Sequence, residues 1–174
     1  MNIVLIGMKS SGKTRVGKAL SLMLNRNFLD TDEILKSLFF KKFQKKKNIF
    51  EIFQKFLKEE KFRILEHDAF CYLKNIKNSI IATGGGSVLN EKNYKILKNS
   101  KIIVYLKASI DTLKKRIQKQ KQNSIFLDEK LLEKAFESRE GIYENIADIT
   151  IQTDNNDIEK IAFEIKNETK YLYV

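Results

Sequence analysis

The 174-residue sequence predicts an α/β fold of three layers, with a five-stranded parallel sheet between two layers of helices. Two observations support this prediction. Short apolar runs alternate along the chain with segments of helical periodicity, which is typical of a parallel sheet covered on both faces. The first apolar run also leads into residues 7–14, a glycine-rich segment of the pattern G-x-x-x-x-G-K-[ST] that precedes a helical pattern.

Buried strands are expected at residues 3–6, 27–30, 79–82, 102–106 and 149–152. The spacing of apolar residues predicts helices at 13–25, 109–120, 129–145 and 156–168, and a largely helical segment at 33–75. That segment, between the second and third strands, is longer than a simple crossover requires. We therefore expect it to form an insertion that binds a substrate.

The composition favours a packed protein of the cytoplasm. Hydrophobic residues make up 43% of the chain, and no apolar run approaches the length of about 18 residues that spans a bilayer. The apolar run at 3–6 follows no basic segment, so we expect no secretory signal and no membrane partner. The single cysteine, Cys71, cannot form an intramolecular disulfide or a cysteine zinc cluster, and we expect it to be a small buried hydrophobe.

The net charge of +11 would attract either nucleic acid or anionic substrates. A nucleic-acid-binding module is therefore an alternative, and it would gather its basic residues into one continuous stripe. In this sequence the lysines are spread along the chain, with one local cluster at Lys41, Lys42, Lys45, Lys46 and Lys47. We expect most of that cluster to be a solvated helix face and expect no nucleic-acid partner.

Residues 7–14, the phosphate loop, are Gly7, Met8, Lys9, Ser10, Ser11, Gly12, Lys13 and Thr14, and we expect all eight to bind ATP. Glycines let backbone N–H groups turn toward phosphate oxygens, and the following helix directs its positive end at the same anion. Lys13 would reach the β- and γ-phosphates, while the Thr14 hydroxyl would bind Mg²⁺. These features predict a P-loop NTPase fold. The alternative is a chance strand-to-helix turn rich in glycine and serine.

Two carboxylates, Asp30 and Asp32, form the motif D-T-D directly behind the apolar pair Phe28-Leu29 of the second predicted strand. Alternation in an extended segment would place both on one side, and parallel sheets form active sites beyond the carboxyl ends of their strands. One carboxylate would then hold the metal or its water. The other would accept a proton from an attacking hydroxyl group. The alternative is that Asp32 only caps a helix that opens at Glu33.

Three more motifs make the pattern specific. They are Glu59-x-x-Phe62-Arg63-x-x-Glu66, Thr83-Gly84-Gly85-Gly86, and Arg139-x-x-x-Tyr143 with Ala147-Asp148 after it. In this order, together with L-D-T-D at 29–32, they resemble the shikimate kinase family over essentially the whole chain. The resemblance implies Mg²⁺-dependent transfer of the ATP γ-phosphoryl group to the 3-hydroxyl of shikimate, a step of chorismate and aromatic amino-acid biosynthesis.

The resemblance also implies a fold like that of nucleoside monophosphate kinases. Its core would comprise residues 1–32, 77–118 and 129–174, with substrate-binding helices at about 33–76 and a mobile lid at about 119–128. The matched positions imply individual roles. Lys13 and its loop bind the ATP phosphates, Thr14 ligates Mg²⁺, Asp30 supports the metal through water, and Asp32 binds and activates the shikimate hydroxyl. Arg63 and Arg139 clamp the shikimate carboxylate, Gly84, Gly85 and Gly86 lie against the substrate, and Arg116 stacks on adenine.

The residue types agree with these implied roles. Guanidinium groups bind a carboxylate bidentately and stay charged, so Arg63 and Arg139 suit a carboxylate clamp in this lysine-rich chain. Glu59 and Glu66 lie one helical turn from Arg63 on either side and are placed to orient it. The glycine triplet allows close approach of backbone to a ligand. The alternatives are surface ion pairs for the charged residues and a plain turn for the glycines.

The sequence departs from the family pattern in the lid and at two other positions. The family's lid usually carries an Arg-Pro-Leu-Leu run whose arginine lies over the phosphates, whereas residues 122–127 read QNSIFL. We hypothesise that Lys119 or Lys121 replaces this arginine. Gly141 stands in place of a proline and is expected to loosen a helix end, and Ser10 stands where glycine is common.

Another small-metabolite kinase of the same fold, such as gluconate kinase, is the nearest rival function. The phosphate loop does not discriminate between the two, whereas the D-T-D, F-R and G-G-G set favours shikimate. The single histidine, His67, offers neither a catalytic dyad nor a metal cluster, and we expect it on a helix surface. We expect a monomer that takes shikimate and ATP.

Overall fold

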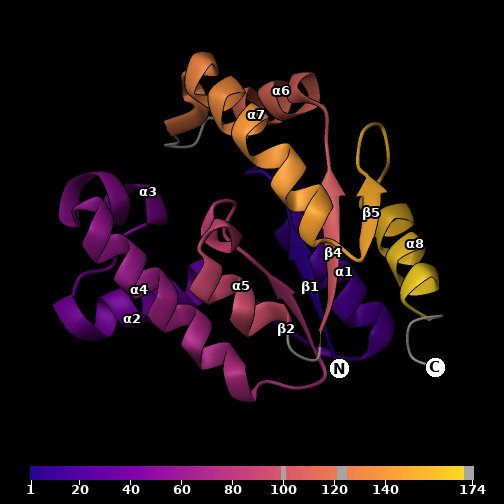
Figure 1. Ribbon diagram of the computed structural model, residues 1–174, viewed down its shortest axis with the longest axis horizontal. Helices are drawn as coiled ribbons and strands as arrows, with labels where there is room; N and C mark the ends of the chain where they lie inside the picture. The colour runs from indigo at the N-terminus through magenta and orange to yellow at the C-terminus, as the bar shows by residue number, and fades with distance from the viewer. Residues whose placement is uncertain (99–100, 121–124, 171–174) are drawn as a thin grey trace.

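The computed structural model describes residues 1–98, 101–120 and 125–170, and its centre is a parallel sheet of five strands (Figure 1). The strands are β1 (Asn2–Ile6), β2 (Asn27–Asp30), β3 (Ser79–Ala82), β4 (Lys101–Lys107) and β5 (Ile149–Gln152), in the order β2-β3-β1-β4-β5. All five predicted strands are confirmed. Only β1 and β4 extend beyond the predicted limits, by one residue at the start of β1 and at each end of β4.

The register of the sheet brings the ends of three strands to one edge. Leu5 of β1 and Asp30 of β2 are both level with Ala82 of β3. The Thr83 amide continues this pairing by donating to the Leu5 carbonyl over 3.1 Å. The segments that follow β1, β2 and β3 therefore begin side by side, beyond the carboxyl edge of the sheet.

Twelve helical elements connect and cover the strands in the described part of the chain. They are α1 (Lys13–Leu24), α2 (Thr31–Phe43), α3 (Ile49–Glu51), the π-helical turn η1 (Ile52–Phe56), α4 (Glu59–Tyr72), η2 (Leu73–Asn75), η3 (Ser87–Leu89), α5 (Glu91–Lys98), α6 (Ile110–Gln120), η4 (Ile125–Leu127), α7 (Glu129–Ile146) and α8 (Ile158–Lys170). The segment predicted as largely helical is interrupted, because α2 ends at Phe43 and its C-cap, Gln44, has a left-handed conformation with φ of 53°. Helix α5 was not predicted, since this short charged segment buries only Asn93 and Leu97.

Successive side chains of a strand point to opposite faces of the sheet, and this alternation produces two apolar layers. In β1, Ile3 and Leu5 face one cluster with Val16 and Leu20 of α1 and Ile161 of α8. Val4 and Ile6 face the opposite cluster, to which the end of α4 and helices α5, α6 and α7 contribute. Figure 1 shows α1 and α8 on one side of the sheet and α5 and α7 on the other. The predicted three-layer architecture is therefore confirmed.

The segment between β2 and β3 has a small apolar core of its own. Helices α2 and α4 and the turn η1 pack around six buried side chains, namely Leu35, Phe39, Ile52, Phe62, Leu65 and Ala69. The lysine cluster lies at one end of this unit, and four of its five members are exposed, as expected of a solvated surface. Because α2 ends at Phe43, Lys45 and Lys47 lie on the following connection, where their ammonium groups lie 5.6 and 5.2 Å from the ring centre of Phe56.

Two residues lie in surroundings that the sequence did not indicate. His67 is half-buried between α4 and α5, where its Nδ1 lies 2.7 Å from Oδ1 of the fully buried Asn93. The Cys71 thiol is half-buried as well and lies 3.6 Å from His67 Nε2. The predictions of a surface histidine and of a buried cysteine were therefore wrong, because His67 contacts Asn93 of the neighbouring helix and Cys71 contacts His67 one turn along α4. None of the described helices combines the length and the apolar character needed to cross a membrane.

Gly141 lies inside α7, which continues to Ile146, so the prediction that it loosens a helix end was wrong. A Cβ at this position would meet no atom within 4 Å. We predict that Gly141→Ala raises the free energy of unfolding by about 0.5–1 kcal/mol, because alanine loses less backbone entropy in a helix. Urea denaturation of the two proteins measures the difference.

Gly17→Ala in α1 is the matched control. Its Cβ would lie 2.5 Å from Phe28 Cε2, so this change is expected to lower stability. A loss of stability in Gly141→Ala as well would contradict the account of α7.

Candidate active site

A cavity of about 1270 Å³ opens at the carboxyl edge of the sheet. This volume exceeds the roughly 300–1000 Å³ of a pocket for one small ligand, so it has room for two. Apart from Gly7 and Met8, every residue predicted for the site lines it, namely Lys9, Ser10, Ser11, Gly12, Lys13, Thr14, Asp30, Asp32, Arg63, Gly84, Gly85, Gly86, Arg116 and Arg139. The chain thus brings the predicted nucleotide-binding and acceptor-binding residues to one place.

The phosphate loop has the backbone of an anion-binding turn. Gly7 has a φ of 136°, and a Cβ there would lie 2.7 Å from the Leu106 carbonyl oxygen, so only glycine fits. Ser10 also adopts a left-handed conformation, with φ of 67°. That conformation is strained for a residue with a side chain and would suit glycine better.

Lys13 begins α1, and its ammonium group points back into the loop. It donates to the carbonyl oxygens of Gly7 and Met8 over 2.8 and 2.7 Å. Burial lowers the pKa of Lys13 to about 8, while the charges of Asp32 and Asp30 act in the opposite direction. A buried cation therefore lies at the centre of the loop, where a phosphate group is expected.

The two carboxylates at the end of β2 and the start of α2 lie close together, although not for the predicted reason. Asp30 is the N-cap of α2 and accepts from the Asp32 amide over 2.9 Å, so Asp32 belongs to the first helical turn rather than to an extended segment. The alternative that Asp32 is the cap was wrong too, because Asp30 has that position. The other oxygen of Asp30 accepts from the Thr14 hydroxyl over 2.7 Å. Two oxygen ligands suited to Mg²⁺ thus lie side by side.

The Asp32 carboxylate faces the glycine loop, residues 84–86. A Cβ on Gly84 would lie 2.8 Å from Asp32 Oδ1. Burial raises the pKa of Asp32 to about 6, with further contributions from the negative charges of Asp30 and Glu66, and Lys13 and Lys9 oppose this rise. A carboxylate with a pKa near neutrality is suited to accept a proton from a substrate hydroxyl group.

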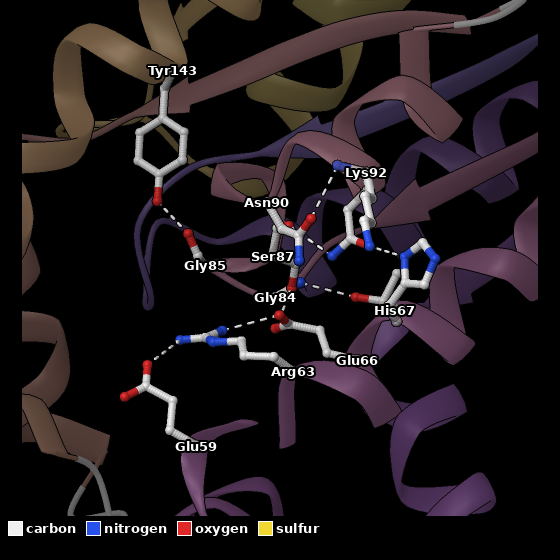
Figure 2. Close-up of polar contacts among 12 residues, drawn as sticks. Glu59, Arg63, Glu66, His67, Gly84, Gly85, Ser87, Asn90, Lys92 and Tyr143 are labelled. Atoms are coloured by element: carbon white, nitrogen blue, oxygen red, sulfur yellow. Dashed lines mark hydrogen bonds and ion pairs between the residues drawn. The ribbon is translucent and has the colours of Figure 1, made fainter. Parts of the chain in front are cut away.

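Arg63 of α4 and Arg139 of α7 reach the other end of the glycine loop. A Cβ on Gly86 would lie 3.7 Å from Arg139 Nη1 and 3.8 Å from Arg63 Nη1. In Figure 2 the Arg63 guanidinium lies between two carboxylates, Glu66 at 2.9 Å and Glu59 at 3.5 Å. Glu66 is only 6% exposed, so the alternative of an ordinary surface ion pair does not apply to it. Two fixed guanidinium groups thus converge on one small space.

Hydrogen bonds in and beside the glycine loop involve residues to which the sequence gave no role. The Thr31 hydroxyl accepts from the Gly84 amide over 2.9 Å, and the Ser87 hydroxyl donates to Glu66 over 2.9 Å. Tyr143 donates to the Gly85 carbonyl (Figure 2), and burial raises the pKa of this phenol to about 12, which keeps it a donor. Thr31 could have been found as the middle residue of D-T-D. Ser87 has no comparable signal.

Arg116 lies on the outer side of the phosphate loop. Its Nη1 donates to the Ser10 and Ser11 carbonyls, each over 3.4 Å, and to the Thr153 hydroxyl over 3.1 Å. Burial lowers the pKa of its guanidinium. Of the predicted lid, Lys119 lines the cavity, whereas Lys121 and residues 122–124 lie outside the described part of the chain. Stacking on adenine and the lid lysine therefore remain predictions.

The fold and this cavity define a phosphotransferase of the P-loop class whose acceptor is a small carboxylate. A comparison with known families defines the class more narrowly. The family model of shikimate kinase matches residues 9–170. The chain belongs to the shikimate kinase family, and it is an enzyme of this kind.

Curated relatives support this membership. The shikimate kinase of Caldanaerobacter subterraneus is 37% identical over 167 residues, which cover 94% of this chain and 93% of that protein. The shikimate kinase of Lactococcus lactis is 35% identical over 170 residues, which cover 97% of this chain and 98% of that protein.

Solved structures resemble the chain over nearly its whole length. Shikimate kinase from Acinetobacter baumannii in complex with shikimate matches with a TM-score of 0.85 and 30% identity, covering 98% of this chain and 93% of that one. A gluconokinase from Sinorhizobium meliloti matches with a TM-score of 0.66 and 17% identity, covering 99% of this chain and 95% of that one. At that identity the second likeness shows the fold alone.

The raised pKa of Asp32 predicts a pH-dependent loss of stability. Its folded-state pKa of about 6 lies above the ordinary 3.8, so between these values the folded protein binds a proton that the unfolded chain has lost. Stability is therefore lost as the pH rises through that window. We predict that Asp32→Asn, which removes the buried charge, is more stable than the parent by about 1–3 kcal/mol at pH 7.5.

The advantage of Asp32→Asn should shrink as the pH falls toward 4, where Asp32 is protonated in the folded protein and partly protonated in the unfolded chain. Urea denaturation at pH 4.5, 6 and 7.5 without metal or nucleotide measures it. A variant no more stable than the parent at pH 7.5 would show that the carboxylate carries no burial penalty.

Proposed function

We propose that the chain transfers the γ-phosphoryl group of ATP to the 3-hydroxyl of shikimate, giving shikimate 3-phosphate and ADP. The observation that carries this proposal is the placement of Asp32 and the two arginines at opposite ends of one glycine loop. Family membership and the shikimate complex of the Acinetobacter enzyme support the choice of acceptor. Gluconate is the alternative acceptor, supported only by a likeness of fold.

Mg²⁺ is the proposed cofactor, held by Thr14 and, through water, by Asp30. The donor set suits this ion, which binds hard oxygen ligands and usually takes one or two carboxylates together with substrate phosphates. Among the described residues no group of three or more His, Cys, Asp or Glu side chains could hold a metal without such help. When bound, Mg²⁺ would neutralise charge on the phosphate oxygens.

In the proposed reaction Asp32 orients the acceptor hydroxyl and takes its proton. The hydroxyl oxygen forms a bond to the γ-phosphorus as the bond from phosphorus to the β,γ-bridging oxygen breaks. Lys13 and the backbone amides of the phosphate loop stabilise the negative charge that shifts onto the ADP oxygens. Because little covalent chemistry falls to the protein, most of the rate enhancement comes from positioning and charge.

The remaining residues take binding roles in this proposal. Arg63 and Arg139 hold the shikimate carboxylate, the backbone of residues 84–86 lies against the ring, and Arg116 stacks on adenine. Residues 1–32, 77–118 and 129–174 serve as the core, about 33–76 as substrate-binding helices, and about 119–128 as a lid that closes to exclude water. We further propose a monomer, because one chain lines the whole described cavity. A cytoplasmic location with no nucleic-acid or membrane partner completes the proposal.

A coupled assay of ADP release with shikimate, gluconate and nucleoside monophosphates tests the proposed activity. We expect turnover with shikimate alone, and we expect Asp32→Asn to lower kcat by about 10²–10⁴-fold because the general base is lost. ADP affinity, measured by calorimetry, should change little. Asp68→Asn, an exposed carboxylate on α4, is the matched control and should keep parental kcat. Full activity in Asp32→Asn would contradict the assignment of Asp32 as the general base.

Removing Arg139 should weaken binding of the acceptor more than binding of the nucleotide. We predict that Arg139→Ala raises KM for shikimate about 10–100-fold, since a charge-assisted contact contributes about 1.5–3 kcal/mol. KM for ATP should stay within about twofold. Steady-state kinetics with either substrate varied measure both constants, and an equal rise in the two would contradict a specific carboxylate contact.

A further inference from the structure

Lys9, the third residue of the phosphate loop, lies where that loop meets the glycine loop. Its backbone nitrogen would lie only 3.1 Å from a Cβ on Gly85. The neighbouring residue, Gly84, lies against the Asp32 carboxylate. The half-buried side chain of Lys9 lines the cavity. Lys9 is therefore located on the border between the nucleotide side of the cavity and the side that faces the acceptor.

The charge of Lys9 is coupled electrostatically to groups of the proposed reaction. Its ammonium interacts electrostatically with both Asp32 and Lys13. Burial lowers the pKa of Lys9, while the Asp32 carboxylate opposes this and favours the charged form. Within the described residues, Lys9 forms none of the side-chain ion pairs or hydrogen bonds, in contrast to Lys13 with its two carbonyl partners.

Several other cations of the cavity wall have different partners or positions. Lys36 pairs with Glu33 at 2.5 Å, Arg116 is bound to Thr153, and Arg63 is bound to Glu66. The predicted lid has no arginine in the sequence, and Lys119 is an exposed residue near the end of α6. A cation for the transferred group is therefore available within the phosphate loop itself.

We propose that Lys9 is a further catalytic residue, whose ammonium group contacts the phosphoryl group as it passes from ATP to the hydroxyl held by Asp32. This proposal rests on the proposed function. Lys9 stays protonated throughout, so the proton of the acceptor hydroxyl still goes to Asp32 and the bonds formed and broken are unchanged. Its contribution is to stabilise charge on the equatorial oxygens of the phosphoryl group, where a fixed cation acts mainly on the transition state.

Replacing Lys9 by methionine, which keeps length and removes charge, tests the proposal. Loss of one transition-state contact predicts a fall in kcat of about 10–100-fold with KM for ATP and shikimate within about threefold. Lys9→Arg should recover a large part of kcat, because it restores the charge. Lys18→Met on the exposed face of α1 makes the same change in net charge and should keep parental kinetics. Thermal unfolding and ADP calorimetry accompany each variant.

Each result of these assays supports or contradicts the proposed role of Lys9. A parental kcat in Lys9→Met overturns the proposal, and so does a rise in KM for ATP without a fall in kcat, which would show ground-state binding only. If Lys9→Met lowers Tm, Lys9→Gln is assayed instead, and parental kcat there has the same meaning. The parent protein is assayed first with shikimate, so a failure of the proposed function itself is seen in the parent and not in the variants.

Discussion

The absence of side chains at residues 84–86 is the constraint on which the site depends. A Cβ on Gly84 would lie 2.5 Å from Ser87 Oγ and 2.8 Å from Asp32, and one on Gly85 would press on the backbone of Lys9. At Gly86 the same atom would stand beside the two arginines. Three consecutive glycines thus bring a carboxylate, the phosphate loop and two guanidinium groups against one stretch of backbone, and a side chain at Gly84 or Gly85 would crowd its neighbours there.

Each helix that brings a charged group to the glycine loop also brings a hydrogen bond that fixes its position. In α2, Thr31 accepts from Gly84 beside Asp32. In α4, Glu66 lies three residues after Arg63 and bonds both Arg63 and Ser87. In α7, Tyr143 lies four residues after Arg139 and bonds Gly85. The spacings of three in α4 and four in α7 place partners on one helix face, so a rotation of either helix would move the anchor and the functional group together.

The sequence predicted those features that local patterns determine. Buried parallel strands are continuous apolar runs, and the phosphate loop has a fixed spacing, so both were located to within a residue. The D-T-D motif, by contrast, fits a helix that starts before or after Thr31, and only the packing of α2 decides that Asp30 is its cap. Helix α5 and the contact of His67 with Asn93 depend on tertiary packing of polar residues, which leaves no periodic signal.

Burial of charge is the last link between this fold and its chemistry. Desolvation raises the pKa of Asp32 and lowers that of Lys13, so each group is held in surroundings that disfavour its charged form. Each also stabilises the other, because an unpaired buried charge costs far more than a paired one. A cavity that already contains Lys9, Lys13, Arg63 and Arg139 therefore favours anionic ligands strongly, since phosphate and carboxylate groups supply the missing negative charge. The net charge of +11 adds a long-range attraction for the same ligands.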